Sequence, residues 1–425
     1  MTARRFLLRV SAFVAGIVGM LVLLELVLRV VPVSEGVYAA DPSRAWPLHR
    51  LVTNSTYTYS SGWNAHNLHR GRVNNFGYVS PVDYRPGESG IVVIGDSYIE
   101  SLMNDYDETL QGRLSHLLDR PQKVMNFGMS GADLPHYLGT ARIVGAHFRP
   151  TWAVILISRN DYQGGFSADT GFFRWAPERD PPIEIVPEVK RSPLVKFVRE
   201  LALVRYVRGN LKVRVRDLVH LRHAIDPQPA TSCTPHPLTA RDKSLTARFV
   251  DELPKALDLP PSRVILVFDT DRRAIYARAP ATAQECPSID DQARERIMQL
   301  AASRGMLIVD TADTFRSHYV ATHERVDFTP EDYHWNPIGH QLVAREVAAI
   351  INAFGSEEGP RQTQVPSTDQ EDRVAASAAG QSRSEREARA HPADEPGPIE
   401  RARVKSPAAG LGRVPTAPEV AAGAL

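Results

Sequence analysis

The sequence has few cysteines and no surplus of charge. Cys233 and Cys286 are the only two cysteines in 425 residues, and they lack the paired spacing of a zinc site. We interpret them as one disulfide or as two buried thiols, depending on the compartment. The formal net charge of +1 provides no basic surplus for nucleic acid. Neither a Gly-x-Gly-x-x-Gly fingerprint nor a P-loop pattern occurs. We therefore predict no nucleic-acid partner, no cofactor and no metal.

Long hydrophobic runs are also scarce, and the one clear example lies at the N-terminus. Residues 10–28 are apolar except for Glu25. This is close to the length of about 20 residues that crosses a bilayer as a helix, whereas the apolar core of a signal peptide has about 7 to 15. We predict an uncleaved transmembrane anchor within residues 1–32. In the alternative of a cleaved signal, Val37-Tyr38-Ala39 would serve as a late cleavage site.

The charges beside the apolar run predict its orientation. Arg4, Arg5 and Arg9 precede it, and the positive-inside rule places such a flank in the cytoplasm. We therefore expect a single-pass protein of the cell membrane whose body lies on the extracytoplasmic (periplasmic or extracellular) side. An oxidising compartment of this kind permits a Cys233–Cys286 disulfide.

The rest of the chain divides by composition. Residues 356–425 contain no Phe, Trp or Tyr and are rich in small, polar and charged residues, so we predict a disordered tail. Residues 33–90 are loop-rich but carry many aromatics, which indicates an ordered extension around the body. The body itself is expected over residues 91–355.

Apolar runs alternate with helical patterns through the body. The runs are continuous rather than alternating, which is typical of a parallel sheet covered on both faces. We expect strands at 91–95, 124–127, 152–158, 264–269 and 307–310, and helices at 108–118, 134–148, 289–303 and 339–353.

About a hundred residues interrupt this alternation, and we treat residues 161–262 as an insert. Within it, the basic stretch 192–223 has the apolar spacing of an amphipathic helix. Such a helix lies on an anionic membrane surface, caps a site, or packs on the body with a solvated basic face. The sequence does not separate these three hypotheses.

Polar motifs follow four of the predicted strands or open the last helix. They are "GDS" at 95–97, "NFGMSGAD" at 126–133, "ISRNDY" at 157–162 and "EDYHWNPIGH" at 331–340. Because the carboxyl ends of parallel strands meet at one edge of a sheet, we expect these segments to lie together. They supply a serine, a glycine-rich turn, an asparagine and an acid beside a histidine, which are the parts that acyl transfer requires.

These four motifs resemble, in order and spacing, the blocks of the SGNH (GDSL-like) hydrolase superfamily. The resemblance covers roughly residues 90–355 and implies a three-layer, flavodoxin-like α/β fold. It implies Ser97 as nucleophile and His334 as general base. It also implies an oxyanion hole made by the backbone N–H groups of Ser97 and Gly131 and by the side-chain amide of Asn160.

Two positions depart from the usual SGNH pattern. Ser158 stands where the third block usually has glycine. The acid usually lies three residues before the histidine, which would be Glu331, whereas Asp332 lies two residues before it. This Asp-x-His spacing is similar to that of the membrane-associated alginate O-acetyltransferases, an SGNH branch. We predict Asp332 as the acid and keep Glu331 in reserve.

Each motif also has a purely structural interpretation. Asp96 or Ser97 would serve as a helix N-cap, Asn160-Asp161 as a loop pair, and a histidine before a helix as a surface residue. Ser130 is a rival nucleophile, but no Gly-x-Ser-x-Gly motif occurs. A protein without catalytic activity would need all four motifs to occur at one edge of the sheet by coincidence, so we predict an enzyme.

The predicted substrate follows by analogy with the family and the anchor. We expect a membrane-anchored serine esterase or O-acyltransferase acting on acyl esters, acetyl among them, of cell-envelope carbohydrate. Two alternatives remain: a lipase or phospholipase-like hydrolase held at the membrane, and a non-catalytic glycan-binding scaffold. An envelope protein complex is a further expected partner.

Overall fold

The computed structural model describes residues 3–40, 48–167, 169–187, 192–213, 237–276, 287–329 and 332–357. Several sequence predictions lie outside these residues: both cysteines, Glu331, residues 214–223 of the 192–223 stretch, and all of the predicted tail beyond residue 357.

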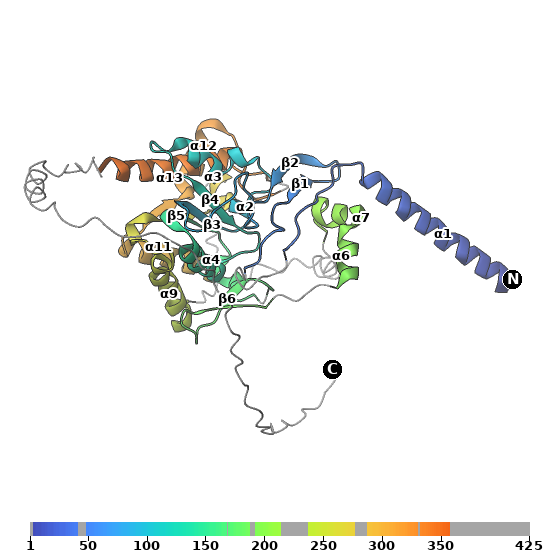
Figure 1. The fold of residues 1–425 in the computed structure, drawn as a ribbon, viewed down its shortest axis with the longest axis horizontal. Coiled ribbons are helices and arrows are strands. Elements are labelled where there is room, and N and C mark those ends of the chain that lie inside the picture. The colour runs from blue at the N-terminus through green and yellow to red at the C-terminus, as the bar shows by residue number, and fades with distance from the viewer. Residues whose placement is uncertain are drawn as a thin grey trace, which may run out of the picture. The chain divides into compact units, whose positions relative to one another are not determined.

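A five-stranded parallel sheet forms the centre of the body (Figure 1). Its strands are β3 (Ser89–Gly95), β4 (Val124–Gly128), β5 (Arg149–Ile157), β8 (Val264–Phe268) and β9 (Leu307–Asp310). They pair in the order β4-β3-β5-β8-β9, with every pair parallel. Counted along the chain this is the order 2-1-3-4-5 of flavodoxin-like sheets. The predicted three-layer fold is therefore confirmed.

Helices cover both faces of the sheet. One core contains residues of α4 (Leu134–His147), α9 (Ala240–Leu257) and α11 (Ile289–Ser303), together with Val92 and Ile94 of β3. The other contains residues of α3 (Leu110–Leu117), α12 (Thr311–Thr322) and α13 (Pro337–Glu357), together with Ile91 and Val93. Successive residues of β3 thus enter opposite cores, which explains why the strand is apolar without a break.

Helix α9 lies within the segment that the sequence suggested as an insert. Its N-terminus has a capping box between Thr239 and Asp242, and Leu245, Phe249 and Leu253 are buried against the sheet. It precedes β8 and packs beside α4 and α11. The structure therefore makes α9 part of the layered fold and narrows the insert to the residues before it.

The segment 33–90 packs onto the body, as its aromatic content suggests. It forms an antiparallel hairpin of β1 (Thr56–Ser61) and β2 (His66–Arg72). Farther along, Tyr78 and Tyr84 are buried against Phe127 of β4, with ring centroids 5.0 and 5.5 Å from it. The Tyr84 hydroxyl accepts a hydrogen bond of 2.8 Å from the backbone N–H of Asn126. The extension therefore contributes to the same core as α4.

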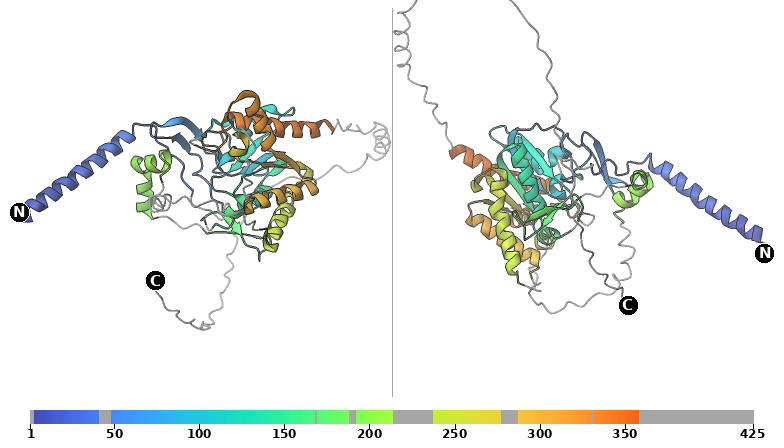
Figure 2. Two further views of the ribbon diagram at one scale, coloured as in Figure 1. Left: turned by 180° about the vertical axis from the view of Figure 1, so that it is seen from behind. Right: turned by 60° about the horizontal axis from the view of Figure 1, so that its bottom comes forward.

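The N-terminal helix α1 (Ala3–Leu28) is long and apolar enough to cross a membrane, and nearly all of its side chains are exposed. Beside its C-terminal end lies the described part of the basic stretch (Figures 1 and 2). This part forms three short helices rather than one: α6 (Pro193–Glu200), α7 (Ala202–Arg205) and η2 (Tyr206–Asn210). Leu201 interrupts the helical path with extended backbone at ψ 130°.

The remaining elements are short. They are α2 (Ser97–Glu100), η1 (Tyr106–Glu108), α5 (Asp161–Gly164), β6 (Phe173–Trp175), β7 (Ile183–Ile185), η3 (Pro261–Arg263) and α10 (Arg272–Tyr276).

Candidate active site

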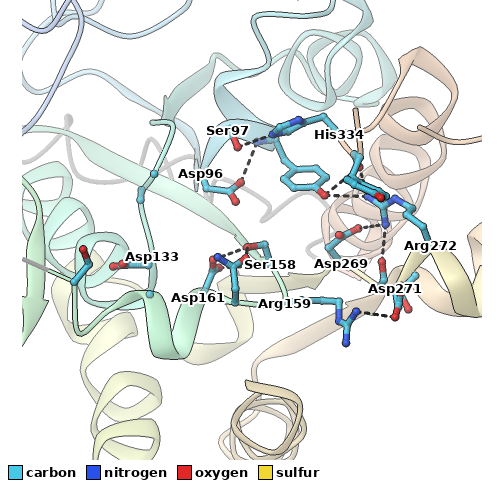
Figure 3. A pocket seen from close by; sticks show the side chains of 18 of the residues that line it. Asp96, Ser97, Asp133, Ser158, Arg159, Asp161, Asp269, Asp271, Arg272 and His334 are labelled. Atoms are coloured by element: carbon cyan, nitrogen blue, oxygen red, sulfur yellow. Dashed lines mark hydrogen bonds and ion pairs between the residues drawn. The ribbon is translucent and has the colours of Figure 1, made fainter. Parts of the chain in front are cut away.

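Ser97 stands directly beyond the carboxyl end of β3, at the first position of α2. Asp96 is the N-cap of this one-turn helix, and its carboxylate accepts a hydrogen bond of 3.0 Å from the backbone N–H of Tyr98. The capping role that we weighed for this motif thus belongs to Asp96. The Ser97 hydroxyl lies 2.7 Å from Nε2 of His334 (Figure 3). That distance is within the range for proton transfer from a nucleophile to a base.

Asp332 lies on the far side of the imidazole. Its Oδ1 contacts Nδ1 of His334 and accepts a hydrogen bond of 3.1 Å from the His334 backbone N–H. Burial raises the pKa of the Asp332 carboxyl, but the His334 hydrogen bond and the Lys212 ammonium outweigh burial and hold this pKa well below its ordinary value. Asp332 is therefore an anion that contacts the imidazole at Nδ1 and also holds the backbone of His334.

Two residues at Asp332 were missed by the sequence analysis. The Lys212 ammonium lies 2.7 Å from Oδ2 of Asp332, and the Tyr59 hydroxyl lies 3.5 Å from the same atom. Lys212 follows η2, and Tyr59 lies on β1. These partners are 120 and 273 residues from Asp332 in the chain, and no local pattern marks them.

A buried ion cluster holds the loop that carries His334. The Arg272 guanidinium pairs with Asp269 at 2.9 Å and with Asp327 at 3.0 Å. It also donates a hydrogen bond of 2.9 Å to the carbonyl of Tyr333. Trp335 donates its indole N–H to Asp269 at 2.8 Å. The residues on either side of His334 are therefore tied to the end of β8.

The candidate oxyanion donors lie in the lining of the same pocket as Ser97. Gly131 has φ +83°, a conformation that favours glycine, and a Cβ there would meet only the ring of Phe172 at 3.9 Å. Asn160 is exposed and occupies the N-cap position of α5, where its side chain makes no capping hydrogen bond. Ser158, which replaces the usual glycine, donates its backbone N–H and its hydroxyl to Asp161 at 2.7 and 2.5 Å. The substituted side chain thus points to Asp161 and stabilises the turn.

The pocket has a volume of about 830 Å³ and a polar, charged lining. Six aspartates and three arginines contribute to it: Asp96, Asp133, Asp161, Asp169, Asp269, Asp271, Arg159, Arg272 and Arg273. In Figure 3, Asp133 lies on one side of the pocket and Arg272 on the other. Burial raises the pKa of Asp133 to about 8 and that of Asp96 to about 6. At neutral pH, Asp133 is therefore largely a neutral acid that can donate a hydrogen bond to a substrate oxygen.

Sheet order and site geometry together define a class of protein. A serine and a histidine in contact at the carboxyl edge of a flavodoxin-like sheet are the features of an SGNH-type enzyme that acts on esters, as a hydrolase or an acetyltransferase. The model of the SGNH hydrolase-like domain of the acetyltransferase AlgX matches residues 231–412, which is less than half of the chain. The resemblance to the SGNH superfamily, in its alginate O-acetyltransferase branch, is therefore confirmed.

No curated protein matches the sequence. Among solved structures, LAE5, an α/β hydrolase enzyme from the metagenome of Lake Arreo, Spain, shares 15% identity at a TM-score of 0.33, covering 63% of this chain and 97% of its own. A catalytic mutant of Axe2, an acetylxylan esterase from Geobacillus stearothermophilus, shares 14% identity at a TM-score of 0.33, covering 64% and 96%. Likeness at this level carries no argument about substrate.

Proposed function

We propose that the protein removes or transfers small acyl groups, acetyl among them, on cell-envelope carbohydrate. Ser97 is the nucleophile, His334 the general base and Asp332 the acid that orients the base. The observation that carries the proposal is the 2.7 Å contact between the Ser97 hydroxyl and Nε2 of His334, with Asp332 at the other ring nitrogen.

The reaction proceeds in two half-reactions. Ser97 Oγ attacks the acyl carbonyl while His334 Nε2 takes the hydroxyl proton, and the developing imidazolium is stabilised by the Asp332 anion. The carbonyl oxygen becomes an oxyanion held by the N–H groups of Ser97 and Gly131 and by the Asn160 amide. His334 then returns the proton to the leaving alcohol, and the acyl-enzyme passes its acyl group to water or to another hydroxyl by the reverse steps.

Three features support a carbohydrate ester as the substrate. The pocket is lined by charged side chains that suit the hydroxyl groups of a sugar, and the long apolar channel that an acyl chain requires is not a feature of this lining. Tyr333, which lines the pocket next to His334, is 62% exposed, and an exposed aromatic ring suits contact with a sugar ring. The matching family model describes an acetyltransferase.

Location follows from α1. We infer that this helix is an uncleaved anchor with its N-terminus in the cytoplasm, because Arg4, Arg5 and Arg9 lie at that end. The body then lies on the extracytoplasmic side, where envelope glycans are available. An envelope protein complex would supply the glycan or the acyl donor.

The decisive experiment compares three forms of the full-length protein in detergent: wild type, Ser97→Ala and Ser130→Ala. Each is treated with a fluorophosphonate probe and analysed by intact mass, and turnover is measured on p-nitrophenyl esters of short and long acyl chains. We expect labelling and short-chain turnover in wild type and in Ser130→Ala, and neither in Ser97→Ala. Ser130 is the matched control because it is the rival serine on the neighbouring turn, bonded to Glu100.

Other outcomes would redirect the assignment. Labelling lost in Ser130→Ala but kept in Ser97→Ala would move the nucleophile to Ser130. A preference for long chains would favour the lipase hypothesis. Glycan binding without labelling or turnover would favour a non-catalytic scaffold. Adding an acetylated donor with a glycan acceptor, and following acetyl on the acceptor by mass spectrometry, separates transfer from hydrolysis.

A further inference from the structure

Helix α6 exposes its apolar side. Leu194, Phe197 and Val198 occupy one face at spacings of three and four residues, and Leu194 and Phe197 are 70% and 60% exposed. The rest of α6 is exposed as well, with Arg199 alone partly covered. A helix that packs on a soluble body covers its apolar face, which α6 does not do. The exposed face of α6 therefore suits an apolar environment outside the protein.

The same region contains a pocket rich in arginine. Its volume is about 310 Å³, and it is lined by the segment that follows α1 and by α6, α7 and η2. Its described lining includes Arg199, Arg205 and Arg208 together with Glu35, which pairs with Arg205. The Nε of Arg205 is buried and has no hydrogen-bond partner within the described structure. The lining is thus positively charged and retains a buried donor, as a site for an anionic oxygen group requires.

The end of α1 fixes where this region lies. Glu25, in the apolar run of α1, accepts hydrogen bonds of 3.0 and 2.9 Å from the backbone N–H groups of Ala202 and Leu203 at the start of α7. Leu28 of α1 and Ala202 are buried in one small cluster. Figures 1 and 2 show α7 beside the end of α1 nearest the body, with α6 adjoining α7. The exposed face of α6 and the arginine pocket are therefore placed where α1 would leave the membrane.

We propose that α6, α7 and η2 dock on the surface of the membrane that α1 crosses. The apolar face of α6 enters the boundary between headgroups and acyl chains, and the arginine pocket binds the phosphate of an anionic phospholipid. The inference rests on α1 being the anchor, as in the proposed function, and not on the esterase chemistry. It selects the membrane-surface hypothesis for residues 192–213, the described part of the basic stretch.

Docking at this place has a consequence for the candidate active site. Lys212, which contacts Asp332, follows η2 by two residues. Asn210 of η2 donates its side-chain N–H to the Ser60 hydroxyl at 2.7 Å and accepts from the Ser34 N–H at 3.1 Å. Through these contacts, the helices that we propose to dock on the membrane are connected to the β1–β2 hairpin and to Asp332, which contacts His334.

The test places a photoreactive residue on α6. Full-length protein carrying p-benzoylphenylalanine in place of Phe197 is reconstituted in nanodiscs of labelled phosphatidylcholine and phosphatidylglycerol in equal amounts, then irradiated. Val320 of α12, also exposed, is the control position for the same substitution. We expect lipid adducts at position 197 and only background at position 320. Equal labelling at the two positions would overturn the docking of α6.

A second arm tests the arginine pocket. In the same nanodiscs, the ratio of phosphatidylglycerol to phosphatidylcholine adducts is compared for the parent, for Arg199→Gln with Arg208→Gln, and for Arg345→Gln, an exposed charge on α13. We expect the ratio of phosphatidylglycerol to phosphatidylcholine adducts to fall roughly fivefold for each of the two pocket arginines that the double variant lacks. We expect it to stay unchanged in Arg345→Gln. An unchanged ratio in the double variant would overturn the pocket as a phosphate site. Melting curves establish that each variant is folded.

Turnover of p-nitrophenyl acetate in the same preparations separates this proposal from the proposed function. Adducts at position 197 without turnover in wild type would remove the esterase assignment and leave the docking intact. Turnover that vanishes in Ser97→Ala, without adducts at position 197, would keep the esterase assignment and overturn the docking.

Discussion

Lys212 offers a sharp test of how the candidate acid works. Its ammonium lies 2.7 Å from Oδ2 of Asp332, while Oδ1 of the same carboxylate contacts His334. Replacing Lys212 by Met removes the charge and keeps much of the side-chain volume. We expect Asp332 to lose one of the contacts that fix its orientation, and the imidazole to be held less firmly.

The expected size of the change in kcat depends on how exposed the Lys212 and Asp332 side chains are. The Lys212 side chain is 47% exposed and that of Asp332 is 11% exposed. A pair of charges at about 4 Å is worth roughly 1 kcal/mol in water and roughly 4 kcal/mol near a protein surface, but measured values for exposed pairs are about 0.2 to 1 kcal/mol. We adopt about 1 kcal/mol, which corresponds to roughly a fivefold lower kcat.

A double-mutant cycle isolates this contribution. Lys212→Met, Asp332→Asn and the double variant are compared with wild type by kcat and KM on p-nitrophenyl acetate. We expect Lys212→Met to lower kcat with little change in KM, and Lys212→Arg to restore most of it. Asp332→Asn should lower kcat by about 10⁴, because the amide no longer holds the imidazole in its reactive tautomer. In that background, Lys212→Met should have no further effect.

The reasoning would be refuted if the two substitutions were additive, because Lys212 would then act without Asp332. Glu331→Gln is the matched control for the neighbouring acid and should retain near wild-type kcat. Full activity in Asp332→Asn, together with loss in Glu331→Gln, would transfer the orienting role to Glu331.

Three further predictions concern the donors, the buried ions and pH. Asn160→Ala should lower kcat by about 10² to 10³ with little change in KM, as expected for a donor used mainly in the transition state, and unchanged kcat would remove Asn160 from the oxyanion hole. Arg272→Met leaves the buried Asp269 carboxylate without its cation and removes one of the two arginines that pair with Asp327; the expected cost is about 3 to 5 kcal/mol in the free energy of unfolding, measured by urea denaturation, and a loss below about 1 kcal/mol would contradict it. Burial raises the pKa of Glu100 from 4.5 to about 7. The folded state therefore binds this proton more tightly than the unfolded state, so the free energy of unfolding should fall as pH rises from about 4.5 to about 7. Glu100 should account for up to about 3 kcal/mol of this fall. Glu100→Gln should remove that share while the contributions of Asp96 and Asp133 remain, and an identical pH profile in the variant would show that Glu100 is not a source of the fall.

Much of the fold could be predicted because its signals are local. The five strands are short apolar runs that end in turn residues, and residues such as Val92 and Val93 must all be apolar because both faces of the sheet are covered. The same topology gathers the segments after β3, β4 and β5 at one edge. This is why Ser97, Gly131 and Asn160 could be grouped from the sequence, and the structure places all three in one pocket.

Helix α9 also had a local signal, which the sequence analysis did not use. A threonine three residues before an acid, followed by apolar residues at helical spacing, indicates a capped amphipathic helix. The basic stretch 192–223 shows what a local pattern does not predict. Its helical periodicity is present, but Leu201 turns the chain so that α7 docks against α1 while α6 remains exposed.

Sequence by itself determined the layered fold, the membrane-length helix and the positions of the serine and histidine motifs, because each depends on residues close together in the chain. Only the tertiary structure decided what surrounds them. Lys212 meets Asp332 across 120 residues, and Ser97 meets His334 across 237. Such contacts depend on how whole elements pack, and periodicity along the chain carries no information about charges that meet through space.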